Sequence, residues 1–549
     1  MHIASIIQLE KHISYIKSLY DLGDFFIVGG AVRDVLLGKK GYILDVDITM
    51  QWDPNNIRQI ISSKKIEGID IFRTEKFGTM TMIISANQLY PWAEGKIKYE
   101  ITPLREESGY EDYRHPDKIT RSDSLLLDAS RRDFTVNAIY YFSFTKDIWL
   151  EDNLDENFVV IKDYDLVWVM FAWGKYNQDV FISYCGDNDI DFSKVRGILI
   201  DPCGGMDDII IWKIRCVGDP DTRFNEDPLR ILRAVRFQNN FNFSTHYDIE
   251  ATSFDYEKYT RDSMKKNYFL IKYLSKERVH EEIIKSFSWN NPFAYVAVLD
   301  ELNLLKYIFP SVYNIKWLEQ PVRYHPFDVY SHTMLALYHL QQINQDPLVR
   351  LAMLYHDVGK VEQYYSHSLN LKDQDRPFIY WSWLNHTNCG VDMVKEDFTK
   401  IWFGNKEIDA ISWYVAMHMK PWEILMSSSD NQPKKIRALL SESDLARCNN
   451  LLDICMWDRS WHYNPIQKPE LEWVVKLRTM LQDLYDAEWQ MTISDMKINW
   501  DDIMNYFGIQ AGPEVGKYIR KVRDRVLEDP ENRNSRKKIF VYLDKVKLQ

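Results

Sequence analysis

The sequence predicts an α+β protein with a small mixed β-sheet near its N-terminus and helices in the remainder. Three observations carry this prediction. Short apolar runs such as FFIVGG, ILDVDITM and KIKYEIT alternate with polar turns from residue 25 to about 140, which is typical of short strands. After Glu226 the apolar residues recur at helical spacing. The tail, from about residue 470, shows the same helical spacing and is more basic.

The elements follow one another in a clear order. Residues 1–22 have the pattern of an amphipathic helix, and the strand-rich segment follows it. Residues 141–200 are acidic and rich in Trp and Tyr, and their alternation predicts extra strands or a hairpin inserted in the first domain. Periodic segments to about residue 310 predict a helical region, and a Pro-containing join leads into a histidine-rich region at about 320–465.

Composition and charge exclude several classes of protein. The 549 residues suggest roughly three or four domains. The net charge of −12 requires any nucleic-acid site to be a local basic patch. None of the six cysteines forms a C-x-x-C pair, which argues against a zinc ribbon or a disulfide scaffold. No run approaches the about 20 apolar residues that span a bilayer, and Glu10 lies too early for a signal peptide. We therefore expect a soluble cytoplasmic protein without a membrane partner.

A glycine turn connects the first predicted strand to a helix in FIVGGAVRDVLLG, residues 26–38. Gly29 and Gly30 would let backbone amides approach a phosphate at the positive end of the helix. Arg33 lies in the first helical turn. Taken alone, this pattern is most often a plain strand–turn–helix.

A pair of aspartates follows in ILDVDITM, residues 43–50. In a strand, Asp45 and Asp47 share one face. Two close carboxylates repel one another unless a cation joins them, and oxygen ligands suit Mg²⁺. Alone, such a pair is usually a solvated strand face. Beside a phosphate turn, it becomes a candidate centre for nucleotidyl transfer, with Glu100 on another predicted strand as a third carboxylate.

Two arginines precede a polar pair in RRDFTVNAIYY, residues 131–141. Arg131 and Arg132 are candidates to hold phosphates. Asp133 and Asn137 would lie one helical turn apart and would suit a ribose hydroxyl. An exposed charged helix start is an equally good interpretation of this segment alone.

A further acid–arginine pair occurs in NEDPLRILR, residues 225–233, which we predict to open a helix. Asp227 and Pro228 have the types preferred at the N-cap and the first helical position. Arg230 would lie on the same side as Asp227. An acceptor beside a donor matches the amine and ring acceptor of cytosine or adenine, but not the order of groups on uracil or guanine. Alone, a capped helix with a local ion pair would be favoured.

The four motifs occur together and in an order that resembles one family. The chain resembles the class II tRNA nucleotidyltransferases and bacterial poly(A) polymerases, whose pattern is GGxVRD, DxD, RRDxxxNA and EDPLRxLRAxRF. Connecting stretches also match, namely KFGTMT at 77–82, YEDYRHPD at 110–117, LIDPCGGMDD at 199–208, VGDPDTRF before Glu226, and SKERVHEEI at 275–283. The resemblance implies a nucleotidyltransferase head at 1–222, a helical neck at 223–318, an HD phosphohydrolase-like domain at 319–465 and a helical tRNA-binding tail at 466–549.

The resemblance also implies roles for individual residues. Asp45, Asp47 and Glu100 would form the catalytic centre, with Mg²⁺ bound by the two aspartates. Glu226 would brace Arg230, and Asp227 with Arg230 would select the incoming base without a nucleic-acid template. The nucleotide-binding set would comprise Gly29, Gly30, Arg33, Arg131, Arg132, Asp133, Asn137, Glu226, Asp227, Arg230 and Arg233.

The resemblance leaves three activities to compare. We favour addition of CCA to the tRNA 3′ end from CTP and ATP, because TEKFGTMTM resembles CCA-adding members and lacks a basic run associated with poly(A) polymerases. The alternatives are a poly(A) or A-adding polymerase and a catalytically inactive RNA-binding protein. The presence of both aspartates argues against the inactive protein.

The histidine-rich region resembles an HD phosphohydrolase domain. His356 and Asp357 are adjacent in the apolar segment LAMLYHDVGK, where a buried polar pair needs partners and a divalent metal would supply them. Lys360 is a candidate to steady a phosphate. The expected substrate is a phosphoester at an RNA 3′ end, and a domain kept only for its shape is the alternative. The resemblance implies that the metal ligands are His332, His356, Asp357, His386, His418 and Asp458.

The tail segment GPEVGKYIRKVRDRV predicts a helix with an apolar stripe of Val515, Tyr518, Ile519, Val522 and Val526. A charged helix face is usually solvated, but the segment resembles the family's tRNA-contacting tail. Contacts between its cations and RNA phosphates would be sensitive to salt. The candidate RNA-binding residues are Lys517, Arg520, Lys521, Arg523 and Arg525.

Overall fold

The computed structural model describes most of the chain. The described residues are 6–19, 25–39, 41–50, 68–74, 79–109, 118–122, 124–143, 154–163, 166–174, 195–242, 254–289, 291–320, 327–362, 385–460, 472–486, 496–527 and 530–547. The YEDYRHPD motif at 110–117, the start of KFGTMT and parts of the 141–200 insertion lie outside them.

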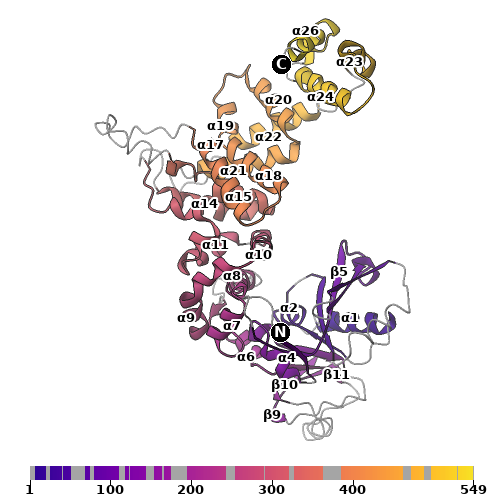
Figure 1. Ribbon diagram of the computed structural model, residues 1–549, viewed down its shortest axis with the longest axis vertical. Coiled ribbons are helices and arrows are strands. Elements are labelled where there is room, and N and C mark those ends of the chain that lie inside the picture. The colour runs from indigo at the N-terminus through magenta and orange to yellow at the C-terminus, as the bar shows by residue number, and fades with distance from the viewer. Residues whose placement is uncertain are drawn as a thin grey trace. The chain divides into compact units, whose positions relative to one another are not determined.

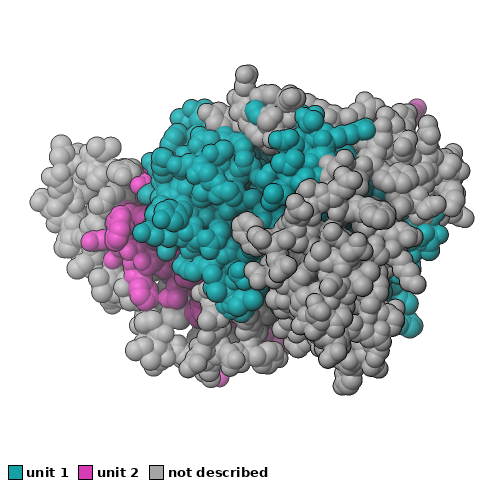
Figure 2. All heavy atoms as spheres, turned by 90° about the horizontal axis from the view of Figure 1, so that it is seen from below, with its two compact units in different colours: residues 1–282, 302–304 teal, residues 283–301, 305–549 magenta. Residues whose placement is uncertain are grey.

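The chain divides into two compact units (Figure 2). The first comprises residues 1–282 and 302–304, and the second comprises 283–301 and 305–549. The strands belong to the first unit, whereas the second unit is helical (Figure 1). This agrees with the predicted α+β class.

A nine-stranded mixed sheet forms the centre of the first unit, in the order β3-β4-β5-β2-β1-β8-β11-β10-β9. β2 pairs with β5, and β10 pairs with β11, in parallel; the other neighbours are antiparallel. β9 and β10 form a hairpin at one edge, so the strands expected in the insertion are present. The strands are β1 (Phe26–Val28), β2 (Asp45–Met50), β3 (Ile69–Thr74), β4 (Thr79–Ser85), β5 (Lys96–Pro103), β8 (Tyr140–Ser143), β9 (Leu154–Asp163), β10 (Leu166–Gly174) and β11 (Val195–Asp201).

Alternation of side chains gives the central strands one buried face and one polar face. In β2, Val46 and Ile48 are buried, whereas Asp45 is exposed. In β5, Tyr99 is buried and its hydroxyl lies 2.8 Å from Nδ1 of His12 on α1 (Ile6–Leu19). Because successive side chains point to opposite faces, α1 covers one face and the acids of β2 lie on the other.

Short helices and turns complete the head. A two-stranded ladder of β6 (Arg105–Ser108) and β7 (Lys118–Arg121) lies apart from the main sheet. A second two-stranded ladder joins β12 (Lys213–Ile214) to β13 (Asp255–Tyr256). The helical elements are α2 (Gly30–Leu36), η2 (Ala86–Gln88), α4 (Leu125–Ser130), η3 (Thr135–Asn137) and α6 (Gly205–Ile210).

The helices that follow the head correct one detail of the prediction. Glu226 does not open the helix that carries Arg230; it ends α7 (Pro220–Glu226), and α8 (Leu229–Asn242) begins three residues later. Asp227 still caps α8, because its Oδ1 accepts a hydrogen bond of 3.1 Å from the backbone N–H of Leu229. Further helices of the first unit are α9 (Lys258–Asn267), η5 (Tyr268–Tyr273) and the start of α10 (Lys276–Ser288).

The second unit consists of helices. Those preceding or forming the histidine-rich region are α11 (Pro292–Glu301), α12 (Leu305–Ile308), α13 (Pro310–Asn314), α14 (Val329–Ile343), α15 (Pro347–Tyr355), α17 (His386–Lys400), α18 (Asn405–Met417), α19 (Lys420–Leu425), α20 (Gln432–Glu442), α21 (Leu445–Ser460) and α22 (Glu472–Leu484). The tail contains α23 (Trp500–Phe507), α24 (Pro513–Leu527), α25 (Pro530–Arg533) and α26 (Arg536–Lys547). None of the described helices combines the length and apolar character needed to cross a membrane.

Candidate functional site

Three carboxylates lie on the polar face of adjacent strands. Asp47 pairs in register with Glu100 of β5, and Asp45 pairs with Lys98. Because paired residues in a parallel ladder point to the same side, all four side chains share that face. Lys98 makes an ion pair with Glu100, so one cationic side chain lies beside these carboxylates. Lys98 is a residue that the sequence reasoning missed.

The electrostatics of this face fit a bound cation. Burial, together with the charges of Asp45 and Glu100, raises the pKa of Asp47 to about 6. Arg132 and Arg233 oppose that rise. Oxygen ligands at close quarters are the kind that Mg²⁺ prefers. The residues present therefore fit Mg²⁺, with Asp45 and Asp47 as its candidate ligands.

The glycine turn lies directly against the aspartates. Gly29 has a left-handed φ of 78°, and a Cβ added there would lie 2.9 Å from Oδ2 of Asp47. Only glycine takes this conformation without strain while the carboxylate approaches so closely. The turn leads into α2, where Arg33 is held by Asp34 (2.8 Å) and by Oδ1 of Asn137 (2.6 Å). The predicted phosphate turn and the predicted metal ligands are therefore neighbours.

A buried aspartate holds the two consecutive arginines. Asp128 is fully buried and accepts hydrogen bonds from Arg131 (2.8 Å) and Arg132 (3.0 Å) and from the hydroxyl of Tyr140 (2.8 Å). Burial alone would raise the pKa of Asp128, but the two guanidinium groups lower it to about 2. Asp128 belongs to none of the motifs that the sequence analysis identified. Its only sign in the sequence is its spacing of three and four residues from Arg131 and Arg132.

Asp133 and Asn137 form part of a polar chain that links α2 to α8. Asn137 donates a hydrogen bond of 3.0 Å to Asp133, and Arg233 donates one of 2.8 Å to the other carboxylate oxygen. The predicted helical spacing of this pair was wrong, because Asp133 precedes a 3-10 turn, η3, rather than lying in an α-helix. The Arg233 ion pair outweighs burial and lowers the pKa of Asp133 to about 2.

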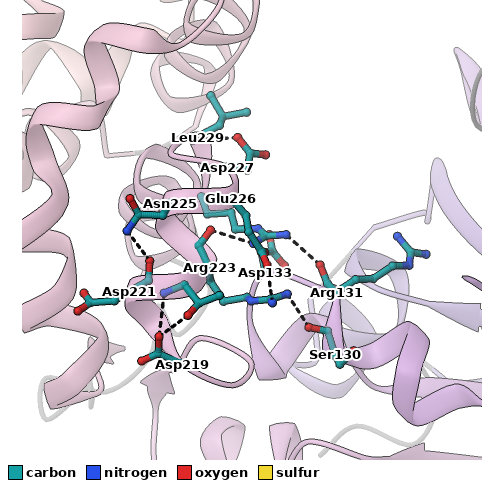
Figure 3. A network of polar contacts seen from close by, with 12 residues as sticks. Ser130, Arg131, Asp133, Asp219, Asp221, Arg223, Asn225, Glu226, Asp227 and Leu229 are labelled. Atoms are coloured by element: carbon teal, nitrogen blue, oxygen red, sulfur yellow. Dashed lines mark hydrogen bonds and ion pairs between the residues drawn. The ribbon is translucent and has the colours of Figure 1, made fainter. Parts of the chain in front are cut away.

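Glu226 and Arg230 form the expected ion pair, with 2.8 Å between Oε2 and Nη1. Figure 3 shows Glu226 among its neighbours Arg223 and Asp227. Nη1 also donates to the carbonyl oxygen of Arg223 (2.9 Å), and Nη2 donates to that of Arg131 (2.9 Å). The other Glu226 oxygen binds Arg223, which in turn donates to the carbonyl of Ser130. These bonds occupy three of the five N–H donors of the Arg230 guanidinium, so two remain for a ligand.

Asp227 has a partner that the sequence reasoning did not find. Arg278, on α10, donates from Nη1 to Oδ1 (3.0 Å) and from Nη2 to Oδ2 (2.6 Å) of Asp227. Together with the bond from Leu229 N, three of about four lone-pair sites of this carboxylate are used. One site on Oδ2 remains. Arg278 lies in the SKERVHEEI segment, but only the fold brings it to Asp227.

Six buried residues meet in the histidine-rich region, each 8% exposed or less. They form two groups of potential metal ligands that share Asp357, and the ligand atoms within each group lie within 4.8 Å of one another. The apolar segment suggested that His356 and Asp357 lie inside a helix. Instead they follow Tyr355, the last residue of α15, and so lie at the end of that helix. α14 carries His332, α17 begins with His386, His418 caps α18, and α21 carries Asp458.

The hydrogen bonds of two histidines fit a metal centre. Nδ1 of His356 lies 2.8 Å from the carbonyl of Met353, and Nδ1 of His418 lies 2.8 Å from that of Val415. Since a carbonyl only accepts, each Nδ1 carries a proton, which leaves Nε2 as the atom that could bind a metal. Nε2 of His356 is buried without a hydrogen bond to any described residue, and Nε2 of His418 lies 3.3 Å from that of His386. A divalent cation satisfies both arrangements.

A close helix contact brings His386 to this centre. A Cβ added at Gly359 would lie 2.0 Å from the carbonyl oxygen of His386, so only glycine permits α17 to approach. Lys360 is buried, and its Nζ binds Asp357 (2.6 Å) and the side-chain oxygen of Gln320 (2.8 Å). Lys360 therefore contacts a candidate metal ligand directly.

The tail helices pack around a small core and expose their cations. Val515, Ile519 and Val522 are buried as predicted, whereas Tyr518 is only partly buried. Lys517, Arg520 and Lys521 are exposed, and Arg523 and Arg525 are partly buried. Arg525 also borders a cleft of about 180 Å³. The sequence reasoning missed the other basic residues of this cleft, which are Arg533, Lys538 and Lys545.

Three family models match the chain in sequence order. The model of the poly A polymerase head domain matches residues 25–155. The model of the probable RNA and SrmB-binding site of polymerase A matches residues 253–315, and the HD domain model matches residues 329–459. The first match includes the glycine turn and the carboxylates, and the third includes all six buried ligands.

Curated relatives are similar to this chain in sequence, and a solved structure is similar to it in fold. The chain is 30% identical over 276 residues to the CCA-adding enzyme of Lactobacillus helveticus, and 30% identical over 302 residues to that of a Geobacillus species. These matches cover 50% and 54% of this chain and span only about half of each relative, 49% and 54% of its length. The fold is similar to the crystal structure of the Bacillus stearothermophilus CCA-adding enzyme in complex with CTP, with a TM-score of 0.52, 20% identity and 98% of both chains covered. The chain therefore belongs to the class II tRNA nucleotidyltransferase and bacterial poly(A) polymerase family and carries an HD domain.

Proposed function

We propose that the protein adds C, C and A to the 3′ end of tRNA from CTP and ATP without a nucleic-acid template. One observation carries the proposal: Asp47 lies against the Gly29 turn and is close enough to Arg233 of α8 for that charge to lower its pKa. The carboxylates, the glycine turn and the helix that we propose to select the base thus lie near one another. The names of the curated relatives, all CCA-adding enzymes, support the same activity.

The proposed reaction is a nucleotidyl transfer. The 3′-hydroxyl oxygen of the RNA forms a bond to the α-phosphorus of the nucleotide, and the bond from that phosphorus to the β-bridging oxygen breaks. Pyrophosphate leaves, and the hydroxyl proton passes to a carboxylate of this face or to water. Asp45 and Asp47 would hold Mg²⁺, which when bound aligns the attacking and leaving oxygens. Arg33, Arg132 and the amides of the Gly29 turn would bind the phosphates.

The free hydrogen-bonding groups support selection of C and A. Asp227 keeps one acceptor site, and Arg230 keeps two donors. Cytosine presents an amine, a ring acceptor and a carbonyl, which match an acceptor followed by two donors. Adenine matches at its amine and ring nitrogen. Uracil and guanine each present a carbonyl oxygen to Asp227 and an N–H to Arg230, so both contacts would be repulsive.

We further propose that the HD domain hydrolyses phosphoesters at RNA 3′ ends. Nε2 of His356, which lies 3.2 Å from Oδ2 of Asp357 and 3.4 Å from Oδ1 of Asp458, supports one or two divalent ions there together with the shared Asp357. Such ions activate water and neutralise the developing charge on phosphate. Water adds its oxygen to phosphorus, the ester oxygen leaves with a proton, and Lys360 would hold the phosphate. A metal-dependent phosphatase assay with RNA carrying a 3′-phosphate or 2′,3′-cyclic phosphate tests this activity.

The basic residues of the tail would orient the RNA. Lys517, Arg520 and Lys521 are exposed on α24, and the cleft beside Arg525 adds further cations. Phosphate contacts by these side chains would release counterions, so RNA affinity would fall steeply with salt.

One assay distinguishes the candidate activities. Purified protein with Mg²⁺ is given tRNA lacking its 3′ CCA, with CTP and ATP offered singly and together. Addition of C, C and A in that order supports the proposal. A long A tail with ATP alone would instead support a poly(A) polymerase, a single A on tRNA ending in CC would support an A-adding enzyme, and no extension would support an inactive RNA-binding protein.

A further inference from the structure

The contact between Arg278 and Asp227 carries an inference that rests on the proposed function. Both carboxylate oxygens receive a hydrogen bond from one guanidinium, at 3.0 and 2.6 Å, in a two-pronged ion pair. The side chains are only 23% and 15% exposed. Such a paired geometry fixes the plane of the carboxylate as well as its position, because rotation breaks one of the two bonds.

The carboxylate of Asp227 needs this support, because Asp227 does not lie within a helix or strand that would fix the position of its side chain. The residue lies between two helices, with an extended φ of −147° and ψ of 95°. Among the described residues, the only other hydrogen bond to its carboxylate comes from Leu229 N and holds Oδ1 alone. Oδ2, which keeps the free acceptor site, is therefore held by Arg278 and by no other described residue.

A second cation would compete for an unsupported Asp227. Arg230 is near Asp227, because its backbone N–H donates a hydrogen bond of 3.1 Å to the carbonyl oxygen of Asp227. Burial lowers the pKa of Arg230, but the negative charges of Glu226 and Asp227 raise it. Without Arg278, Asp227 would turn toward Arg230 and pair with it directly. That contact would consume the acceptor and the donors that the base must meet.

We propose that Arg278 is a specificity-positioning residue: it holds Asp227 so that Oδ2 accepts the exocyclic amine of cytosine or adenine. Arg278 donates both of its hydrogen bonds to the carboxylate and acts on the base only through Asp227. The proposal deepens the nucleotide selection proposed above, because it states what keeps the selecting groups apart.

A chemical double-mutant cycle tests the proposal in the full-length protein. Single-nucleotide addition is measured for wild type, Arg278→Met and Arg278→Lys, with CTP, UTP and a CTP analogue that lacks the 4-amino group. Arg261→Met is the matched control, since Arg261 of α9 pairs with Asp255 at 3.8 Å. Thermal melting of each variant accompanies the kinetics.

We expect Arg278→Met to reduce kcat/KM for CTP by about 30- to 100-fold, the range for losing a hydrogen-bonded contact of a charged group. Wild type should use the amine-free analogue far worse than CTP, whereas the variant should use both within about threefold. Arg278→Lys, which keeps the charge without the fork, should fall in between. Arg261→Met should behave as wild type.

Equal losses for CTP and the analogue would overturn the proposal, because a structural role weakens both alike. Unchanged preference for CTP over UTP in Arg278→Met would also overturn it. If Arg278→Met does not fold, the same comparison is made with Arg278→Lys. If the wild-type protein adds no C, the proposed function itself is contradicted. That result is distinguishable from failure of the Arg278 proposal, in which the wild type is active.

Discussion

The acidic centre of the head and the centre of the HD domain differ most in exposure. In the head, Asp45 is exposed and Glu100 is partly exposed, and both lie on an open strand face. In the HD domain, six candidate metal ligands from five helices and their ends are 8% exposed or less. An open pair of carboxylates needs the phosphates of a substrate to complete the coordination of Mg²⁺. A closed set of histidines and aspartates can hold a metal by itself.

The difference in exposure would correspond to two ways of using metal in one chain. We expect the head to acquire its ions together with the nucleotide and the HD domain to keep its ions between reactions. The following predictions test this contrast, from the largest expected effect to the smallest.

Asp47→Asn should abolish nucleotide addition, with a loss of at least about a thousandfold, because the proposed Mg²⁺ site loses one of its two aspartate ligands. Primer extension on tRNA lacking CCA measures the loss. Metal content and hydrolysis by the HD domain should not change. Asp70→Asn, at an exposed position of β3, is the control. Parallel loss of hydrolysis would show that the two centres are not independent.

His356→Ala should lower the metal affinity of the HD domain by more than about 100-fold, because the variant loses a proposed metal ligand itself. Loss of a residue that only hydrogen-bonds to a ligand already lowers metal affinity by about 10- to 100-fold. Elemental analysis after gel filtration should detect metal in the wild type and little in the variant. Nucleotide addition should be unaffected. His339→Gln on α14 is a suitable control, since His339 stacks on Trp457 and lies outside both ligand groups. Wild-type protein that loses all its metal on the column would contradict the contrast.

The buried His12 should make the stability of the head depend on pH. Burial lowers the pKa of His12 to about 4, from 6.5 in the unfolded chain. Between these values the unfolded state binds more protons, so the free energy of unfolding rises with pH and is flat above about 6.5. The shift corresponds to about 3 kcal/mol, lost as the pH falls from 6.5 to 4.

Hydrogen exchange of peptides from the head, measured in urea at several pH values, tests this dependence. Subtracting the profile of His12→Gln removes the contribution of the other acids. A difference profile that stays flat between pH 4 and 6.5 would show that His12 titrates near its ordinary value.

Arg230→Ala should weaken selection of C and A over U and G by about 10- to 100-fold, because two donors to the base are lost. Competition assays with mixed nucleotides measure the change, and Arg215→Ala, paired with Asp208 at 3.0 Å, is the control. If selection is lost because the base contact is missing, and not because the variant is unstable, adding a stabiliser such as glycerol should not restore it. An unchanged preference would remove Arg230 from the proposed base contact.

The sequence determined the identity and order of the local motifs. Asp45 and Asp47 share a face because two positions separate them on one strand, and Gly29 precedes a helix because the apolar run ends there. The HD ligands were recognised from a family pattern, and the structure brings all six together. Prediction from local spacing failed where one helix ends and the next begins. Glu226 ends α7 instead of opening α8.

Tertiary structure decided which partners those motifs meet. Arg278 reaches Asp227 across 51 positions, and Asn137 reaches Arg33 across 104. Asp128 is the anchor of two arginines only because the sheet buries it against Tyr140. Periodicity reports which face of an element is apolar, but it carries no information on which distant element packs there. The groups that could perform the chemistry are therefore readable in the sequence, whereas the contacts that hold them in place depend on the fold.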